Sequence, residues 1–388
     1  MNHQSKSLFV LVRGGYLYDP QEQGVKDVLF SGGRIILVKD QIDVGDLLRT
    51  DVIDASNKIV IPGLIDLHVH LIGGGGEAGP ASRIPEIAVS KLTEAGITTA
   101  VGPLGMDDVS RSLETLLVKT KALHTEGLST YMYTGGCHLP SPTITGSVKH
   151  DISLINEIIG VKVAISDHRG SQVTFAELAR ISSQARIGGM LSGKPGLVHV
   201  HVGSGSRGLG LLFDVVEHTE IPISQFLPTH ISRTPFLLQQ GVDWVEKGGC
   251  IDITMPEDAD NTIQILKELS DSGMNLNRVT FSSDGNGSSP RFDDQHKLIG
   301  MSISSVSTLL STFKALVQAG QVSLVDVLQF VTSNPADRLG ISEHKGRICE
   351  GADADLVILS KDLCIDKVFA NGRLMVEAGK AVVKGTFE

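Results

Sequence analysis

The sequence lacks the features that mark several large classes of protein. It has no pair of close cysteines and no CxxC motif, which argues against a disulfide framework and for reduced thiols. It has no basic excess, since a net charge of -10 argues against a nucleic-acid-binding face. No apolar run approaches the ~20 residues of a membrane span. The first residues, MNHQSKSLFVLV, carry no signal-peptide pattern, so we expect a cytoplasmic protein.

Short β-rich runs alternate with amphipathic segments through the middle of the 388-residue chain. Parallel strands need crossover helices, so the alternation predicts an α/β fold, a (β/α)8 TIM-like barrel over residues 61–342. An open doubly wound sheet would give a similar alternation, but the number and length of the runs favour the barrel. The eight predicted strands are, in order, 58–71, 97–105, 128–136, 161–166, 196–203, 222–232, 250–254 and 278–285.

Both ends of the chain have a different pattern. Residues 8–54 and 343–388 contain short alternating strands punctuated by Gly, Asn and Asp. Neither end is long enough to close a sandwich alone. We therefore expect residues 1–60 and 343–388 to pair into one small β-sandwich domain.

Two histidines stand two residues apart in the stretch GLIDLHVHLIGGGGEAG, residues 63–79. On a strand, residues i and i+2 point to the same face, so His68 and His70 would both reach the mouth of a barrel, where active sites of this fold lie. Two converging imidazoles suit a first-row metal ion. A lone HxH pattern is more often a surface or structural feature, so a metal site needs further ligands.

Three further residues of metal-ligand type close other predicted strands. His201 ends the fifth strand, His230 the sixth and Asp284 the eighth. Each alone could be a buried polar side chain that forms its hydrogen bonds within the core. Asp284, which precedes Gly-Asn-Gly, also suits an Asx-turn. Together these strand ends supply four histidines and one carboxylate where a barrel would gather them. The combination predicts a metal centre.

Lys162 is unusual because it lies in an otherwise apolar predicted strand, VKVAIS. A buried cation beside a metal ion is strongly disfavoured. The lysine could extend to solvent from an edge strand, or it could pair with an acidic group. Alternatively, its amine has reacted with CO2 to give a carbamate, an anion with two oxygens that could bridge two metal ions.

Taken together, these residues resemble the binuclear centre of the amidohydrolase superfamily. A longer set of motifs resembles the isoaspartyl (β-aspartyl) dipeptidase family within it, over essentially the whole chain. The two most specific motifs are GGGGEAGP and ISDHR, and the others are LTEAGITTAVG, TGSVKHD, LPTHISR, VTFSSDGNGS and the final GKAVVKGTFE.

The resemblance implies a role for each candidate metal ligand. His68, His70 and Asp284 would hold one Zn2+, while His201 and His230 would hold a second. Carboxylated Lys162 (N6-carboxylysine) and a hydroxide would bridge the two ions. Asp284 would also be catalytic, because it would take the proton of the attacking hydroxide and pass it to the leaving amine.

The same resemblance implies a set of substrate contacts. Glu77 would bind the free α-amino group of the substrate, and the glycines before it would offer backbone N–H donors. Two arginines and a serine would hold carboxylates. At two further positions the chain departs from the family pattern, with Met106 where a threonine is usual and Cys137 where a tyrosine commonly polarises the scissile carbonyl. The predicted substrate-binding residues are Gly75, Gly76, Glu77, Met106, Cys137, Arg169, Arg233 and Ser288.

The expected reaction is hydrolysis of the isopeptide bond in β-aspartyl dipeptides, which releases aspartate and an amino acid. One alternative is a cyclic-amide hydrolase of the same superfamily, such as a hydantoinase or dihydroorotase. Glu77 argues against it, because such substrates have no free ammonium group. A different alternative is a non-catalytic, dihydropyrimidinase-related scaffold, which the complete ligand set argues against. The resemblance further implies a homo-oligomer, an octamer, and the charge and apolar content of the sequence argue against a nucleic-acid or membrane partner.

Overall fold

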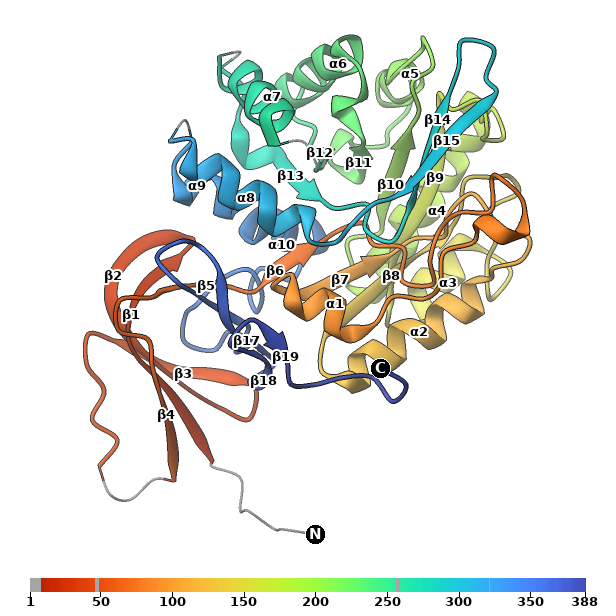
Figure 1. Ribbon diagram of the computed structural model, residues 1–388. Helices are drawn as coiled ribbons and strands as arrows, with labels where there is room; N and C mark the ends of the chain where they lie inside the picture. Colours follow the sequence, from red (N-terminus) through yellow and green to blue (C-terminus); the bar gives the residue numbers. More distant parts are fainter. Residues whose placement is uncertain (1–7, 46–48, 256–258, 272, 321) are drawn as a thin grey trace.

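The computed structural model describes residues 8–45, 49–255, 259–271, 273–320 and 322–388. Figure 1 shows a barrel with helices around it and a smaller β-sheet to one side. The sheet contains strands from both ends of the chain. Within the described residues, no helix has the length and apolar character needed to cross a membrane.

Eight parallel strands form the barrel, as predicted. Six belong to one sheet in the order β11-β10-β9-β8-β7-β6, and β12 pairs with β13 and lies against β11. A parallel bridge between Val69 and Gly285 connects the segment after β6 to the segment after β13. The strands are β6 (Leu64–Asp66), β7 (Ile97–Gly102), β8 (Ser129–Gly135), β9 (Ile158–Ile165), β10 (Leu197–Val202), β11 (Phe226–Thr229), β12 (Ile251–Thr254) and β13 (Val279–Ser282).

The predicted strands differ from the observed ones by up to three residues at an end, and two of them differ more. The run 58–71 is not one strand, because β5 (Ile59–Pro62) joins the small sheet whereas β6 begins the barrel. This single apolar run therefore crosses from one part of the fold to the other. In the run 222–232, the first residues form a 3-10 turn, Ile223–Gln225, before β11 begins.

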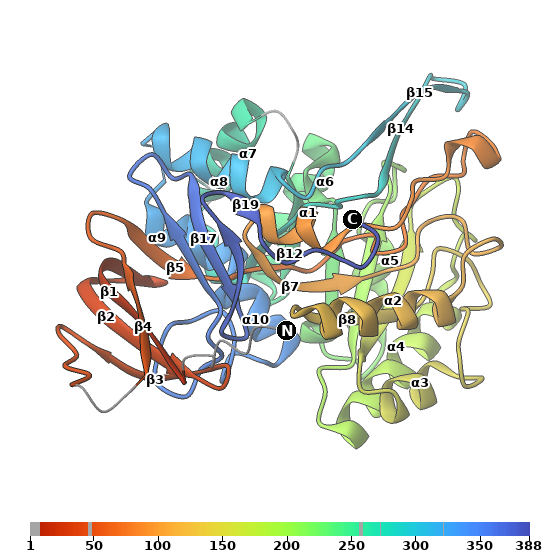
Figure 2. The ribbon, with the colours of Figure 1, turned by 60° about the horizontal axis from the view of Figure 1, so that its bottom comes forward.

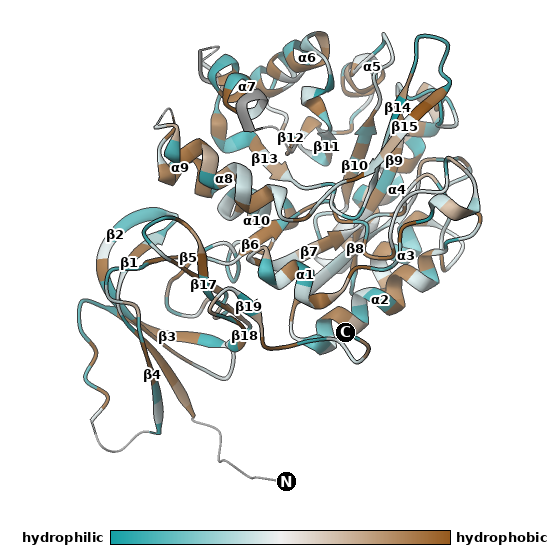
Figure 3. Ribbon diagram, in the orientation of Figure 1, coloured by the Kyte–Doolittle hydropathy of each residue, from teal (hydrophilic) through white to brown (hydrophobic). Residues whose placement is uncertain are grey.

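The helices pack against the outer face of the barrel strands, and the largest hydrophobic cluster lies between the two layers. Figure 3 shows apolar residues concentrated on the strands, whereas the helices also carry polar stretches. The α-helices are α1 (Val89–Glu94), α2 (Leu113–Glu126), α3 (Val148–Leu154), α4 (Phe175–Ser192), α5 (Gly210–His218), α6 (Pro235–Glu246), α7 (Ala259–Asp271), α8 (Thr308–Gln318), α9 (Leu324–Val331) and α10 (Ser333–Leu339). Short 3-10 helices are η1 (Pro80–Ser82), η2 (Ile223–Gln225), η3 (Ile231–Arg233) and η4 (Leu276–Arg278).

The small β-sheet contains nine strands in the order β19-β18-β17-β16-β5-β1-β2-β3, with β4 paired to β1. Figure 2 shows the strands of the two chain ends side by side. Antiparallel pairing of β5 with β16 is the point where the two ends meet. A domain division at residues 60 and 343 stays a prediction. The other strands are β1 (Phe9–Asp19), β2 (Gln21–Ser31), β3 (Arg34–Lys39), β4 (Thr50–Asp54), β16 (Leu356–Leu359), β17 (Ile365–Ala370), β18 (Arg373–Glu377) and β19 (Lys380–Ala381).

An antiparallel hairpin follows the last barrel strand. It consists of β14 (Ser288–Phe292) and β15 (Leu298–Ile303) and projects from the barrel in Figure 2. The tip is attached to the loop after β9, since the ring of His168 stacks on that of His296 with centroids 4.7 Å apart. The sequence patterns did not predict this hairpin.

Candidate active site

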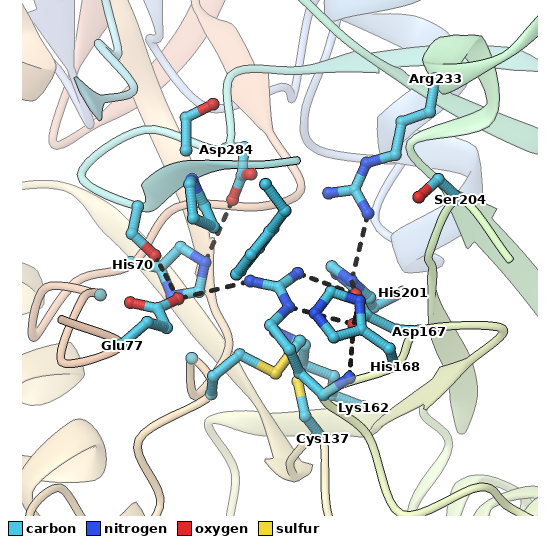
Figure 4. Close-up of a pocket in the computed structure, with 18 residues that line it drawn as sticks. His70, Glu77, Cys137, Lys162, Asp167, His168, His201, Ser204, Arg233 and Asp284 are labelled. Atoms are coloured by element: carbon cyan, nitrogen blue, oxygen red, sulfur yellow. Dashed lines mark hydrogen bonds and ion pairs between the residues drawn. The ribbon is translucent and has the colours of Figure 1, made fainter. Parts of the chain in front are cut away.

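A cavity of about 290 Å³ lies at the carboxyl ends of the barrel strands. Figure 4 shows its charged and sulfur-containing side chains pointing toward a common space. Ten of the predicted site residues line it: His70, Glu77, Met106, Cys137, Lys162, Arg169, His201, Arg233, Asp284 and Ser288. Gly74 also lines it, whereas Gly75 and Gly76 line a neighbouring cavity that shares Glu77 and Met106.

His68, His70 and Asp284 form a tight cluster. Nε2 of His70 lies 3.1 Å from Oδ1 of Asp284, and Nε2 of His68 lies 3.4 Å from the same oxygen. The two Nε2 atoms are 3.3 Å apart. The segment after β6 supplies both histidines, and the loop after β13 supplies Asp284 in the left-handed region, with φ 50°.

This cluster fits a metal ion. One ligand atom from each of the three residues lies within 4.8 Å of the others. Burial lowers the pKa values of His68 and His70, which favours the neutral imidazoles that metal ions bind. The buried Nδ1 of His70 has no hydrogen-bond partner. Two neutral imidazoles and a carboxylate form a donor set that first-row divalent ions accept.

His201 and His230 form a second group beside the first. Their ring centroids are 4.6 Å apart, and those of His68 and His230 are 5.3 Å apart. Burial and the neighbouring charge of Arg233 lower the pKa of His201 to about 3. Nδ1 of His230 lies 2.6 Å from the hydroxyl of Thr254. The five predicted strand-end ligands thus come together as one group.

Lys162 is buried in β9, with only 2% of its surface exposed. Because β9 pairs with both β8 and β10, Lys162 does not extend from an edge strand. No ion pair of Lys162 with a carboxylate occurs in the described part of the chain. Its Nζ donates to the carbonyl of Leu104 at 2.6 Å. Neither extension to solvent from an edge strand nor pairing with an acidic group therefore explains the buried lysine. The carbamate is a proposal.

Glu77 has one occupied and one free carboxylate oxygen. Its Oε1 accepts hydrogen bonds from Oγ of Ser288 at 2.7 Å and from Nη1 of Arg169 at 3.5 Å. Its Oε2 is buried and has no partner. A buried carboxylate oxygen without a donor favours a ligand that brings one.

Arg111 holds the glycine loop that carries Glu77. This buried guanidinium donates from Nη2 to the carbonyls of Gly74 at 3.0 Å and Ile84 at 2.8 Å, and from Nη1 to the carbonyl of Ile72. Gly73 has φ 77°, and a Cβ there would clash with the carbonyl of Ile84. The bare glycines let the loop pack this closely.

Arg169 is fixed by Asp167, a residue that the sequence reasoning did not select. Nε and Nη2 of Arg169 donate to Oδ1 and Oδ2 of Asp167 at 3.0 and 2.8 Å. Oδ2 of Asp167 also lies 2.9 Å from Nε2 of His201. Burial would raise the pKa of Asp167, but these hydrogen bonds and charges hold it well below its usual value. A signal was available, because Asp167 belongs to the quoted motif ISDHR.

The tyrosines near Cys137 do not replace the missing tyrosine of the family pattern. Tyr133 is fully buried, stacks on His199 and donates its hydroxyl to the carbonyl of Leu67 at 3.2 Å. Tyr131 packs with the cluster inside the barrel, and neither ring lines the cavity. Cys137 does line the cavity, and burial raises the pKa of its thiol.

Comparison with known proteins agrees with this geometry. The model of the amidohydrolase family matches residues 245–375. The β-aspartyl dipeptidase of Fervidobacterium islandicum AW-1, solved in complex with β-Asp-Leu dipeptide, is 41% identical with a TM-score of 0.91. The match covers 96% of this chain and 98% of that one. The chain belongs to the β-aspartyl dipeptidase family of amidohydrolases.

More distant similarities of this β-aspartyl dipeptidase family member extend to a hydantoinase structure and a dihydroorotase sequence. A D-hydantoinase from Thermus sp. is 17% identical with a TM-score of 0.71, and the match covers 97% of both chains. A dihydroorotase from Streptococcus thermophilus (strain CNRZ 1066) is 25% identical over 90% of both chains. The predicted superfamily and TIM-like barrel are thus confirmed, and the chain is an amidohydrolase.

Proposed function

We propose that this chain hydrolyses the isopeptide bond of β-aspartyl dipeptides and releases aspartate and an amino acid. The observation that carries the proposal is the unpartnered, buried Oε2 of Glu77 beside the metal-ligand cluster. A β-aspartyl dipeptide has one free ammonium group and two α-carboxylates. Glu77 matches the ammonium group, whereas Arg169 and Arg233 in the same cavity match the carboxylates.

The donor set supports a pair of metal ions, with zinc as the proposed metal. His68, His70 and Asp284 would hold one ion, and His201 and His230 the other, with carboxylated Lys162 shared between them. When bound, such a pair lowers the pKa of a water molecule and polarises a carbonyl group. Imidazole and carboxylate are ligands that zinc accepts, and bound zinc lowers the pKa of its water to about 7.

Asp284 is the proposed proton carrier. Burial would raise its pKa, but the hydrogen bond from His70 and the neighbouring charge of Arg233 help to hold it below the usual value. The carboxylate is therefore ionised at neutral pH and can accept a proton from the attacking water. Asp284 lines the cavity, so the same oxygens can deliver that proton to the leaving amine.

The arginines and Ser288 would orient the substrate. Arg169 is fixed at two atoms by Asp167, so its remaining Nη1 points at the Glu77 side of the cavity. Arg233 donates from Nη1 to the carbonyl of Val202 at 3.0 Å. A guanidinium whose position is already fixed loses little freedom when it binds a carboxylate.

A substrate panel tests this proposal against the cyclic-amide alternative. The purified metal-loaded protein is assayed with β-Asp-Leu, N-acetyl-β-Asp-Leu, dihydroorotate and hydantoin, and metal content is measured on the same sample. We expect turnover of β-Asp-Leu alone. Turnover of dihydroorotate or hydantoin, or equal rates on free and N-acetylated peptide, would contradict the role of Glu77. Protein that holds its metal but turns over nothing would support the non-catalytic scaffold.

A further inference from the structure

His199 lies one layer deeper in the barrel than His201. Side chains alternate along β10, so Leu197, His199 and His201 face the barrel interior while the valines between them pack against the helices. The pairing of β10 with β9 sets His199 directly opposite Lys162. The sequence contains a signal for this residue, because His199-Val200-His201 repeats the HxH spacing of His68 and His70.

His199 contacts His68 at the nitrogen that does not face the other ligands. Nε2 of His199 lies 2.9 Å from Nδ1 of His68, and both residues have no exposed surface. The other ring nitrogen of His68, Nε2, faces His70 and Asp284. The ring of His199 stacks on Tyr133, with centroids 4.7 Å apart and an interplanar angle of 6°.

This contact constrains where the protons lie. Both imidazoles are buried, which favours neutral rings that carry one N–H each. If His199 donated through its Nε2, Nδ1 of His68 would be the acceptor and the single proton of His68 would lie on Nε2 of His68. That nitrogen would then have no lone pair to offer beside Asp284. If His68 donates through Nδ1, its Nε2 lone pair is free for a metal ion. Metal-binding histidines usually donate their second nitrogen to a fixed acceptor of this kind.

We infer that His199 is a positioning residue that accepts the Nδ1 proton of His68 and thereby fixes the tautomer and orientation of this proposed metal ligand. His199 then carries its own proton on Nδ1, which is buried and has no hydrogen-bond partner. A residue retained only for packing would not leave a buried nitrogen unsatisfied. The inference rests on the proposed metal centre and is independent of the substrate.

Zinc affinity measured without substrate tests the inference. Metal-free wild type, His199→Phe and Tyr133→Phe are titrated with Zn2+ against a chromogenic chelator, and the Tm of each metal-free protein is recorded. His199→Phe keeps a flat ring against Tyr133 but removes the acceptor. Tyr133→Phe is the matched control, because it keeps the stack and changes no atom that contacts His68.

We expect His199→Phe to weaken binding of one Zn2+ by about 10- to 100-fold, as loss of a histidine's outer partner typically does. Its metal-free Tm should fall only modestly, because the variant removes the unpaired Nδ1 of His199 but leaves the Nδ1–H of His68 without an acceptor. Tyr133→Phe should keep wild-type affinity. If His199→Phe does not fold, His199→Leu makes the same test.

The inference would be overturned if the zinc affinity of His199→Phe stayed within about twofold of wild type, because a loss of about 10-fold or more is expected. So would an equal loss of zinc affinity in Tyr133→Phe, because a general disturbance of the packing around His68 would then explain the loss. Wild type that binds no zinc would instead overturn the proposed metal centre, so the two failures are distinguishable.

Discussion

The hydroxyl of Ser288 donates a hydrogen bond to Oε1 of Glu77 at 2.7 Å. This bond connects the first residue of the β14–β15 hairpin to the residue that follows the four glycines. It orients the carboxylate so that Oε2 stays free within the cavity wall. Recognition of the substrate's ammonium group therefore depends on two segments that are more than two hundred positions apart in the chain.

Glu77→Gln should weaken recognition of the ammonium group. A hydrogen bond to a charged group contributes about 1.5–3 kcal/mol, so kcat/KM for β-Asp-Leu should fall by about 10- to 150-fold. The metal content should not change, because Glu77 is not a proposed ligand. Glu86→Gln is the matched control, because it removes the same charge at an exposed position, where Glu86 pairs with Lys119. Unchanged kcat/KM in the Glu77 variant would contradict its assigned role.

Lys162→Ala should lose metal and activity together. The account treats Lys162 as the source of a bridging anion, so its loss removes a shared ligand of both proposed ions. A short carboxylic acid at high concentration should restore part of both, because its carboxylate can occupy the vacated position. Elemental analysis and turnover are measured on the same sample. A fully active Lys162→Arg variant would rule out the carbamate.

Asp284→Asn should reduce kcat far more than it weakens substrate binding. Proton transfer occurs only in the transition state, and removal of a general base typically costs about 10²- to 10⁴-fold. For wild type, the pKa of Asp284 is held below its usual value, so the acid-side loss of kcat/KM should begin only below the pH range in which an ordinary aspartate titrates. Protonation of Asp284 at lower pH removes the base, so kcat/KM falls as the pH falls. A variant with wild-type kcat would show that Asp284 is only a turn residue.

Arg111→Met should raise the KM for β-Asp-Leu about tenfold, because the carbonyls of Ile72, Gly74 and Ile84, which lie in and beside the glycine loop, lose a charged donor. Metal content should stay at the wild-type value. Arg83→Gln is the control, since Arg83 also pairs with Asp107 but from an exposed position. If kcat and metal content fell in the Arg111 variant while KM stayed constant, the loop would not be the element that Arg111 positions.

Cys137→Tyr should raise kcat. A tyrosine hydroxyl would add a donor for the developing oxyanion, and one such donor typically contributes about 2.7–4 kcal/mol. The thiol of Cys137 is a weaker donor than a tyrosine hydroxyl. The hydroxyl of Tyr133 already donates to the carbonyl of Leu67, so Tyr133 does not supply the missing donor. Cys137→Ala should keep most of the activity. An inactive Cys137→Ala variant that still holds its metals would show that the thiol is itself catalytic.

The thiol of Cys137 should also react slowly with iodoacetamide at neutral pH, because burial raises its pKa and the thiolate is the reactive form. Exposed Cys364 provides the internal comparison. Peptide mapping after a timed exposure measures both sites in one experiment.

Much of the fold and the convergence of the candidate metal ligands could be predicted because both depend on local patterns. Strand alternation fixes which side chains face the barrel interior, and strand ends place His201, His230 and Asp284 at one mouth. The partners of these residues were harder to predict, because Asp167 and Arg111 act through tertiary hydrogen bonds. The β14–β15 hairpin was missed because its residues show no clear alternation between apolar and polar positions.

Selectivity between peptide isomers tests the central claim most directly. Equal concentrations of β-Asp-Leu and α-Asp-Leu are incubated with the purified, metal-loaded protein in one reaction, and both are followed by chromatography with mass detection. The two peptides have the same mass and formal charges, so they differ only in which carboxyl group of aspartate forms the peptide bond and which stays free. The account predicts that β-Asp-Leu is consumed with release of aspartate and leucine while α-Asp-Leu persists. Equal loss of both peptides, or loss of α-Asp-Leu alone, would contradict it.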